Sequence, residues 1–325
     1  MSKHYAVISV GTNSTRVLLA DMAPEFPHVD LAQSIGTRIG EGLGQRGHLG
    51  EEPMQRTIDG IAQLNRMVRG HYLKLFALAT SAVRRADNGD EFAARVREVL
   101  GVDLTVLTGD EEAAASYRGA ITAFGALHGE RVGVVDMGGG STEYAVGSAP
   151  QPERHVSCEI GAVRLTESVP ELAGRDGVVA LSTIERARAI ARQALESIRD
   201  YPPIERLAIV GGTATTTASI IRGRKGKVAS FTLTRASLQK VLVRLCGMTL
   251  KERKEVPGMK PQRADILPGG IIVLDTVLDI VKRDIVVATA ADLLLGFLLQ
   301  QRDDGTIGAG QRQPVHAGSE TRRGH

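Results

Sequence analysis

The chain has 325 residues, of which 42% are apolar and 24% charged, enough to bury the cores of two ordinary domains. A formal net charge of +3 argues against a dedicated nucleic-acid-binding protein. No apolar run approaches the length of a membrane span, no signal peptide precedes the first turn, and the two cysteines, Cys158 and Cys246, fit no metal or redox spacing. We therefore expect a two-domain α/β protein of the reducing cytoplasm, without nucleic-acid or membrane partners.

Strand-like and helix-like segments alternate along the chain. A strand, a glycine-led turn and a second strand occupy 5–22, helical spacing covers 51–70, and a strand at 73–80 precedes a helix at 90–101. A strand at 103–109 leads into a helix at 111–127, and another strand, turn and strand follow at 131–147. Beyond these we expect a helix near 182–200, a strand at 206–212 and helices to about 300. The tail, 303–325, has no periodicity and is predicted to be disordered.

The two strand–turn–strand segments form an internal repeat. When "VISVGTNSTRVLL" is set beneath "VVDMGGGSTEYAV", both copies show a strand, a glycine-led turn with Ser-Thr, and a returning strand. Ser9 then falls opposite Asp136. Such a repeat, each copy opening an α/β stretch, indicates a duplicated domain with a cleft between the halves.

The glycine-rich turns are candidate phosphate cradles. Backbone N–H groups can converge on an anion where no Cβ blocks the approach, and hydroxyls add further donors. A single GGGS is weak support, because hairpins also use glycine for conformation alone. Two facing turns are stronger support, and the absence of G-x-x-x-x-G-K-[ST] excludes a P-loop protein.

Acidic residues flank these turns. Asp136 ends one strand and Glu143 begins the next, where both could face a phosphate-bound cation such as Mg²⁺. Three further acids, residues 110–112, lie at a strand-to-helix junction. The preference of helix N-termini for negative charge is enough to explain three acids at this position. A functional role for one of them is the open alternative.

Together these stretches resemble the exopolyphosphatases and guanosine pentaphosphate phosphohydrolases, a family of the actin, sugar-kinase and chaperone-ATPase fold superfamily. The matching stretches follow the family's order up to about residue 300: "GTNSTR" (11–16), "TRIGEGLGQRGHLGEE" (37–52), "ATSAVRRADN" (79–88), "TGDEEA" (108–113), "VVDMGGGSTEY" (134–144), "EIGAVRLTE" (159–167), "IVGGTATTTASI" (209–220) and "RADILPGGIIVL" (263–274). The resemblance implies the short form with two ribonuclease-H-like (actin-like ATPase) domains, at 1–125 and 126–302. The last helix would pack back on the first domain.

The resemblance also implies roles for single residues. Glu112 would be the catalytic base, and Asp136 and Glu143 the metal-handling acids. Phosphate contacts would come from the two turns and three arginines: Gly11, Thr12, Asn13, Ser14, Arg16, Arg84, Gly138, Gly139, Gly140, Ser141 and Arg263.

The chain departs from the family pattern in three places. Ser9 stands where the family usually has Asp, Arg85 where Asp is common, and "ATAADLLLGFLL" where an arginine-containing pattern is usual. The loss of the Asp at position 9 is expected to weaken metal binding or the rate.

We therefore expect Mg²⁺-assisted hydrolysis of the terminal phosphoanhydride of linear polyphosphate or guanosine pentaphosphate. The protein is expected to be cytoplasmic, and the family resemblance implies a homodimer. Two alternatives are a weakened polyphosphate or alarmone sensor, indicated by Ser9 and Arg85, and a phosphotransferase between polyphosphate and a nucleotide. A purely structural role would leave the two cradles without a purpose.

Overall fold

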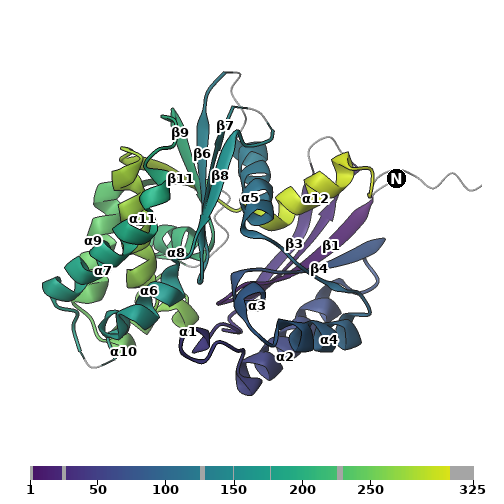
Figure 1. Ribbon diagram of the computed structural model, residues 1–325, viewed down its shortest axis with the longest axis horizontal. Coiled ribbons are helices and arrows are strands. Elements are labelled where there is room, and N and C mark those ends of the chain that lie inside the picture. Colours follow the sequence, from purple (N-terminus) through teal and green to yellow (C-terminus); the bar gives the residue numbers. More distant parts are fainter. Residues whose placement is uncertain are drawn as a thin grey trace, which may run out of the picture.

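The computed structural model describes residues 3–23, 27–124, 129–148, 150–175, 177–224 and 230–307. It contains two β-sheets, each with its own helices (Figure 1). The helices α5 (Gly109–Phe124) and α12 (Leu293–Asp303) pack against each other between the two halves. No helix among the described residues is long and apolar enough to cross a membrane.

The first sheet has the strand order β3-β2-β1-β4-β5. The first three strands form an antiparallel meander, and β4 and β5 run parallel to β1: β1 (His4–Val10), β2 (Thr15–Asp21), β3 (His28–Ile35), β4 (Lys74–Ala79) and β5 (Leu104–Val106). One face is covered by α2 and α4, because Ile61, Leu64 and Phe92 pack against Ile8 and Val10. The helices of this half are α1 (Leu43–Arg46), α2 (Glu51–Val68), α3 (Ser81–Arg85) and α4 (Gly89–Leu100).

The second sheet has the order β10-β11-β9-β6-β7-β8 and repeats the same antiparallel meander in β6, β7 and β8. Its strands are β6 (Val132–Met137), β7 (Thr142–Gly147), β8 (Arg154–Cys158), β9 (Arg206–Val210), β10 (Ser230–Thr234) and β11 (Ile285–Thr289). Its helices are α6 (Ala162–Ser168), α7 (Leu181–Ala194), α8 (Gly212–Ile221), α9 (Arg235–Cys246), α10 (Leu250–Lys254) and α11 (Leu267–Ile280). Three 3-10 turns, Pro170–Ala173, Glu196–Ile198 and Pro261–Arg263, complete it.

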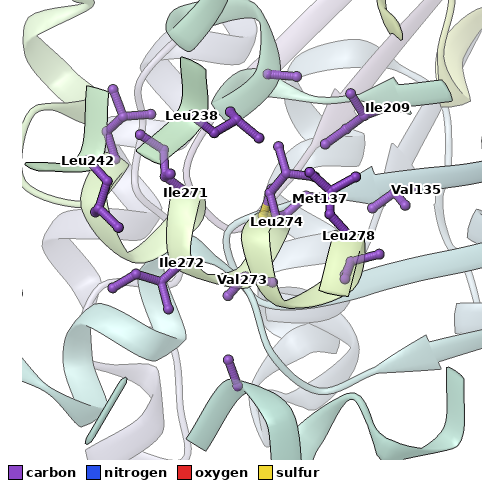
Figure 2. Packing of buried hydrophobic residues seen from close by; sticks show 14 of the residues in the cluster. Val135, Met137, Ile209, Leu238, Leu242, Ile271, Ile272, Val273, Leu274 and Leu278 are labelled. Atoms are coloured by element: carbon purple, nitrogen blue, oxygen red, sulfur yellow. The ribbon is translucent and has the colours of Figure 1, made fainter. Parts of the chain in front are cut away.

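The larger core surrounds α11, whose sequence "LPGGIIVLDTVLDI" is apolar on nearly every side, as a fully buried helix requires. Figure 2 shows Leu274 and Leu278 of this helix close to Val135 and Met137 of β6. Because β6 is anchored in this core, the turn at residues 138–141, which directly follows β6, is held in a fixed place.

The last helix, α12, follows β11 of the second sheet but packs on the first. Leu294 and Leu298 of α12 belong to one buried cluster with Val7 of β1 and Leu18 of β2. The predicted tail at 303–325 lies outside the described residues from 308 onward.

The α/β fold class with two similar halves is confirmed, but the predicted run of helices after residue 212 is interrupted. β10 and β11 lie within it, and the helix expected at 182–200 ends at Ala194, followed by a 3-10 turn. β11 ("IVVAT") is a five-residue apolar run, and apolar runs of this length do not distinguish a strand from a buried helix by periodicity.

Candidate active site

The internal repeat is a structural repeat. In the first copy the amide of Gly11 donates to the carbonyl of Ser14 (3.0 Å), and in the second the amide of Gly138 donates to the carbonyl of Ser141 (3.1 Å). The same four-residue turn therefore closes both hairpins. We call them the first turn (residues 11–14) and the second turn (residues 138–141).

The backbone behind each turn holds its carbonyl groups. The amides of Gly40 and Arg38 donate to the carbonyls of Thr12 and Asn13 (3.0 and 3.1 Å), and the amide of Val163 donates to the carbonyl of Gly139 (2.9 Å). By contrast, the amides of residues 12–14 and 139–141 have no hydrogen-bond partner within the described ranges. Six adjacent free N–H donors favour an anion.

The two turns touch each other. A Cβ atom added at Gly140 would lie 2.7 Å from Oγ1 of Thr12 and 2.8 Å from Oγ of Ser81, closer than real side chains approach. Glycine at this position therefore allows the second turn to lie directly against the first half of the molecule.

Where the turns meet, they line a pocket of about 80 Å³. Every predicted site residue except Arg84 lines this pocket. The pocket wall also contains residues to which the sequence analysis gave no site role: Ser9, Thr80, Met137, Gly211, Gly212, Leu293 and Leu294.

Two of the acids in the pocket are cross-strand neighbours. Asp136 of β6 pairs directly with Glu143 of β7, so both side chains stand on one face of the sheet. Asp136 accepts a hydrogen bond from Ser116, and Glu143 accepts one from Ser157 (2.8 Å). Burial raises the pKa of Asp136 to about 6, and burial together with the charges of Glu112 and Asp136 raises the pKa of Glu143 well above its ordinary value.

Glu112 lies in the first turn of α5, where its side chain is only 6% exposed. It is bonded by Arg84, whose guanidinium also donates to the carbonyl of Leu107 (2.6 Å). Burial raises the pKa of Glu112 to about 7, although the Arg84 charge acts in the opposite direction. The structure therefore places Arg84 beside this acid rather than on the pocket wall.

Two arginines bring positive charge to the other side of the pocket. Arg16, the cross-strand partner of Ser9, is bonded to Asp292 at the start of α12. Arg263 donates to Oγ of Ser14 (3.1 Å) and lies directly over Gly212, where an added Cβ would be 1.9 Å from its Cζ. Burial and the charge of Arg16 lower the pKa of Arg263 to about 10.

The sequence reasoning missed the residues that position these groups. Ser116 lies one helical turn after Glu112 in "EEAAASY", on the same face of α5, which was a detectable signal. Asp292 is the N-cap of α12 and accepts from the amide of Leu294 (3.1 Å). Its capping position was readable from sequence, but its contact with a residue 276 positions earlier was not.

No group of three or more His, Cys, Asp or Glu side chains within the described ranges gathers closely enough to hold a metal ion by itself. A metal at Asp136 and Glu143 would thus need further ligands from the substrate or from water.

Comparison with known proteins shows the family to which the chain belongs. Residues 20–298 match the Ppx/GppA phosphatase family. The chain is 33% identical over 287 residues to exopolyphosphatase 2 of Mycobacterium tuberculosis, covering 83% of this chain and 88% of that protein. It is 26% identical over 316 residues to a bifunctional 3-dehydroquinate synthase/phosphatase of Fusobacterium nucleatum, covering 91% of this chain but only 46% of that longer protein.

Solved structures give the same result. The Aquifex aeolicus PPX-GPPA enzyme superposes with a TM-score of 0.75 at 25% identity, covering 92% of this chain and 100% of its own. An exopolyphosphatase-like protein superposes with a TM-score of 0.84 at 27% identity, covering 92% and 97%. The expected two-domain actin-like fold and hydrolase class are confirmed, and the chain belongs to the Ppx/GppA phosphatase family.

Proposed function

We propose that this protein hydrolyses the terminal phosphoanhydride bond of linear polyphosphate in the pocket between the two turns. The observation that supports this most directly is the set of free amides at residues 12–14 and 139–141, which belong to the turns that line one small pocket together with three acids. Free amides favour the phosphate, whereas the acids disfavour it unless they act on a water molecule or a cation. Hydrolysis gives both sets of groups a role.

Phosphate binding falls to the turns and the cations. The amides would receive the oxygens of the terminal phosphate, and Arg16 and Arg263 would neutralise the charge of the adjoining bridge. Phosphoryl transfer depends mainly on such positioning and charge neutralisation, because little covalent chemistry is required of the protein.

Glu112 is suited to orient and deprotonate the attacking water. A general base works best when its pKa lies near the working pH, and burial raises the pKa of Glu112 to about 7. Arg84 fixes the carboxylate through a charge-assisted hydrogen bond. Arg84 therefore positions the base. The proton of the water goes to Glu112 as the oxygen attacks the terminal phosphorus, and the bond from that phosphorus to the bridging oxygen breaks, so that orthophosphate and the shortened polyphosphate are released.

Asp136 and Glu143 fit Mg²⁺. Their carboxylates stand side by side on adjacent strands, next to the predicted phosphate position, and Mg²⁺ in proteins uses one or two carboxylates plus substrate oxygens and waters. When bound, the ion would neutralise charge on the phosphate oxygens. Ser116 and Ser157 hold the two carboxylates in place.

Guanosine pentaphosphate is a second candidate substrate, favoured by a neighbouring cavity of about 290 Å³. This cavity shares Thr12 and Asn13 with the catalytic pocket, and its wall includes Val163, Pro170 and Ile266. The same wall carries hydroxyl, amide and charged side chains, among them Thr166, so a nucleoside would find both apolar surface and hydrogen-bonding partners there.

Phosphate release with Mg²⁺ tests the proposal, on long polyphosphate, tripolyphosphate and guanosine pentaphosphate in parallel. We expect Glu112→Gln to lose turnover by about 100-fold or more, since general-base catalysis contributes about 10²–10⁴-fold. Glu111→Gln is the matched control, because Glu111 is exposed and its carboxylate accepts from the amide of Thr108 (2.8 Å). Full activity in Glu112→Gln would refute the assignment.

The same assay separates the alternatives. Ligand binding without phosphate release, with release restored by Ser9→Asp, would indicate a sensor that lacks one carboxylate. Consumption of polyphosphate only in the presence of ADP would indicate a phosphotransferase. The homodimer and the cytoplasmic location stay predictions.

A further inference from the structure

Arg16 and Arg263 are the cations in the wall of the catalytic pocket, and among the described residues only Arg16 is paired with an acid. Arg16 comes from β2, and its guanidinium bonds the carboxylate of Asp292, the residue that precedes α12. Within the described ranges this is the one hydrogen bond of the Arg16 side chain. Because a guanidinium carries five N–H donors, most of them are left for a ligand in the pocket.

Asp292 is itself fixed from two directions. Its Oδ1 accepts from the amide of Leu294 (3.1 Å) as the N-cap of α12, and its Oδ2 accepts from Arg16. The helix α5 crosses α12 at this point (Figure 1), so closely that a Cβ atom added at Gly119 would overlap the carbonyl oxygen of Asp292. The Asp292 side chain is 15% exposed. A carboxylate held in this way fixes the orientation of the guanidinium bonded to it.

Asp136 is the acid that competes for Arg16. Both residues line the same pocket of about 80 Å³. Burial lowers the pKa of Arg16, but the charges of Asp292 and Asp136 raise it above its ordinary value. Without the carboxylate of Asp292, the cation would therefore be drawn toward Asp136. A pair between Arg16 and Asp136 would have to be broken before Arg16 could bind a phosphate.

We propose that Asp292 is a positioning residue that holds the Arg16 guanidinium ready for the phosphate chain and keeps it from pairing with Asp136. This inference rests on the proposed function, because it takes polyphosphate as the ligand of the pocket. Asp292 does not line the pocket itself, so it acts through Arg16. It reaches Arg16 because α12 returns from the second half of the chain to pack on the first sheet.

Asp292→Asn tests the proposal, because asparagine caps a helix as well as aspartate does but carries no charge for Arg16. We expect KM for tripolyphosphate to rise about tenfold, the loss typical of one charge-assisted hydrogen bond. The kcat should stay within about twofold, since bound polyphosphate draws Arg16 back from Asp136, and Tm should change little. Asp303→Asn is the matched control: Asp303 ends the same helix and pairs with Arg118 of α5, and neither residue lines the pocket.

Calorimetric binding of tripolyphosphate in the presence of EDTA provides a reading that needs no turnover. Asp292→Asn should bind about tenfold more weakly than the intact protein, by the same contact. In the background of Asp136→Asn, however, the substitution Asp292→Asn should make no difference, because the competing acid is then absent. A residue that only stabilises the helix would not show this dependence on Asp136.

An unchanged or lower KM in Asp292→Asn would overturn the proposal, since Asp292 would then do no more than neutralise Arg16. A tenfold loss of binding that persists in the Asp136→Asn background, or an equal loss in Asp303→Asn, would overturn it as well. The proposed function fails separately, if the intact protein releases no phosphate. Tripolyphosphate binding that weakens in Asp292→Asn but not in the Asp136→Asn background would support the role of Asp292 even then.

Discussion

Replacing Arg84 by Met tests whether this arginine sets the protonation of Glu112, the proposed general base. Arg84 donates to Glu112 and to the carbonyl of Leu107, and Glu112 is almost fully buried. Methionine keeps the apolar length of the side chain but removes the cation. Because a nearby positive charge favours the ionised carboxylate, its removal must raise the pKa of Glu112 further.

The expected size follows from the hydrogen bond that is lost. A hydrogen bond to a charged group contributes about 1.5–3 kcal/mol, and about 1.4 kcal/mol corresponds to one pH unit. Starting from a pKa of about 7, Glu112 would then titrate about 1 to 2 pH units higher. At pH 7 the ionised fraction would fall from about one half to between about 1% and 10%, a loss of about 5- to 50-fold in rate.

The assay is kcat/KM for tripolyphosphate between pH 5.5 and 9.5. The base must be ionised to act, so activity rises with pH through the pKa of Glu112, and this rise should move to higher pH in Arg84→Met. At pH 9.5 most of the activity should return. Arg85→Met is the control, because Arg85 lies 3.5 Å from Glu159 rather than against Glu112. An equal loss at every pH would refute this reasoning and assign Arg84 to substrate binding.

Two further predictions concern other parts of the pocket. Gly212→Ala should raise KM for tripolyphosphate about tenfold with little change in Tm, because the added Cβ would displace the Arg263 guanidinium. Arg263→Met should raise KM by the same factor. The KM of the double variant should be no higher than that of either single variant, because both changes remove the same contact. Asp136→Asn should abolish most phosphate release yet raise Tm at pH 8 but not at pH 4. The folded protein holds the proton of Asp136 up to about pH 6, against about 3.9 in an unfolded chain, so ionisation costs the native state up to about 3 kcal/mol above that range. Thermal unfolding at both pH values checks this, and an equal Tm difference at the two would contradict it.

Much of the site was predictable because its parts repeat along the chain. Ser9 and Asp136, aligned from the sequence alone, occupy equivalent places in two hairpins that close with the same hydrogen bond, and both line the pocket. The turn glycines were identifiable because any Cβ atom would block the close approach of another group to the backbone of the turn, so only glycine fits there. Local patterns of this kind depend on a few neighbouring positions and can be read directly.

What the sequence did not reveal depends on contacts between distant segments. The role of Arg84 was expected at the phosphate, but its guanidinium bonds Glu112, and the choice between these partners depends on where the fold places α3 relative to α5. The partner of Arg16 lies on α12, and only the return of this helix to the first sheet brings them together. The strand β11 was hidden because its short apolar run fits a helix equally well.

The repeat also gives Ser9 a meaning that differs from a simple loss. In the second hairpin the cross-strand pair is Asp136 with Glu143, two acids, whereas in the first it is Ser9 with Arg16, a hydroxyl and a cation. A carboxylate at position 9 would lie opposite Arg16, which already pairs with Asp292, and would reduce the positive charge that Arg16 and Arg263 bring to the pocket. The two copies of one motif would thus contribute different groups to the proposed hydrolysis. The second hairpin would supply the two acids that hold the metal and the first would supply a cation, whereas both turns would supply free amides for the phosphate.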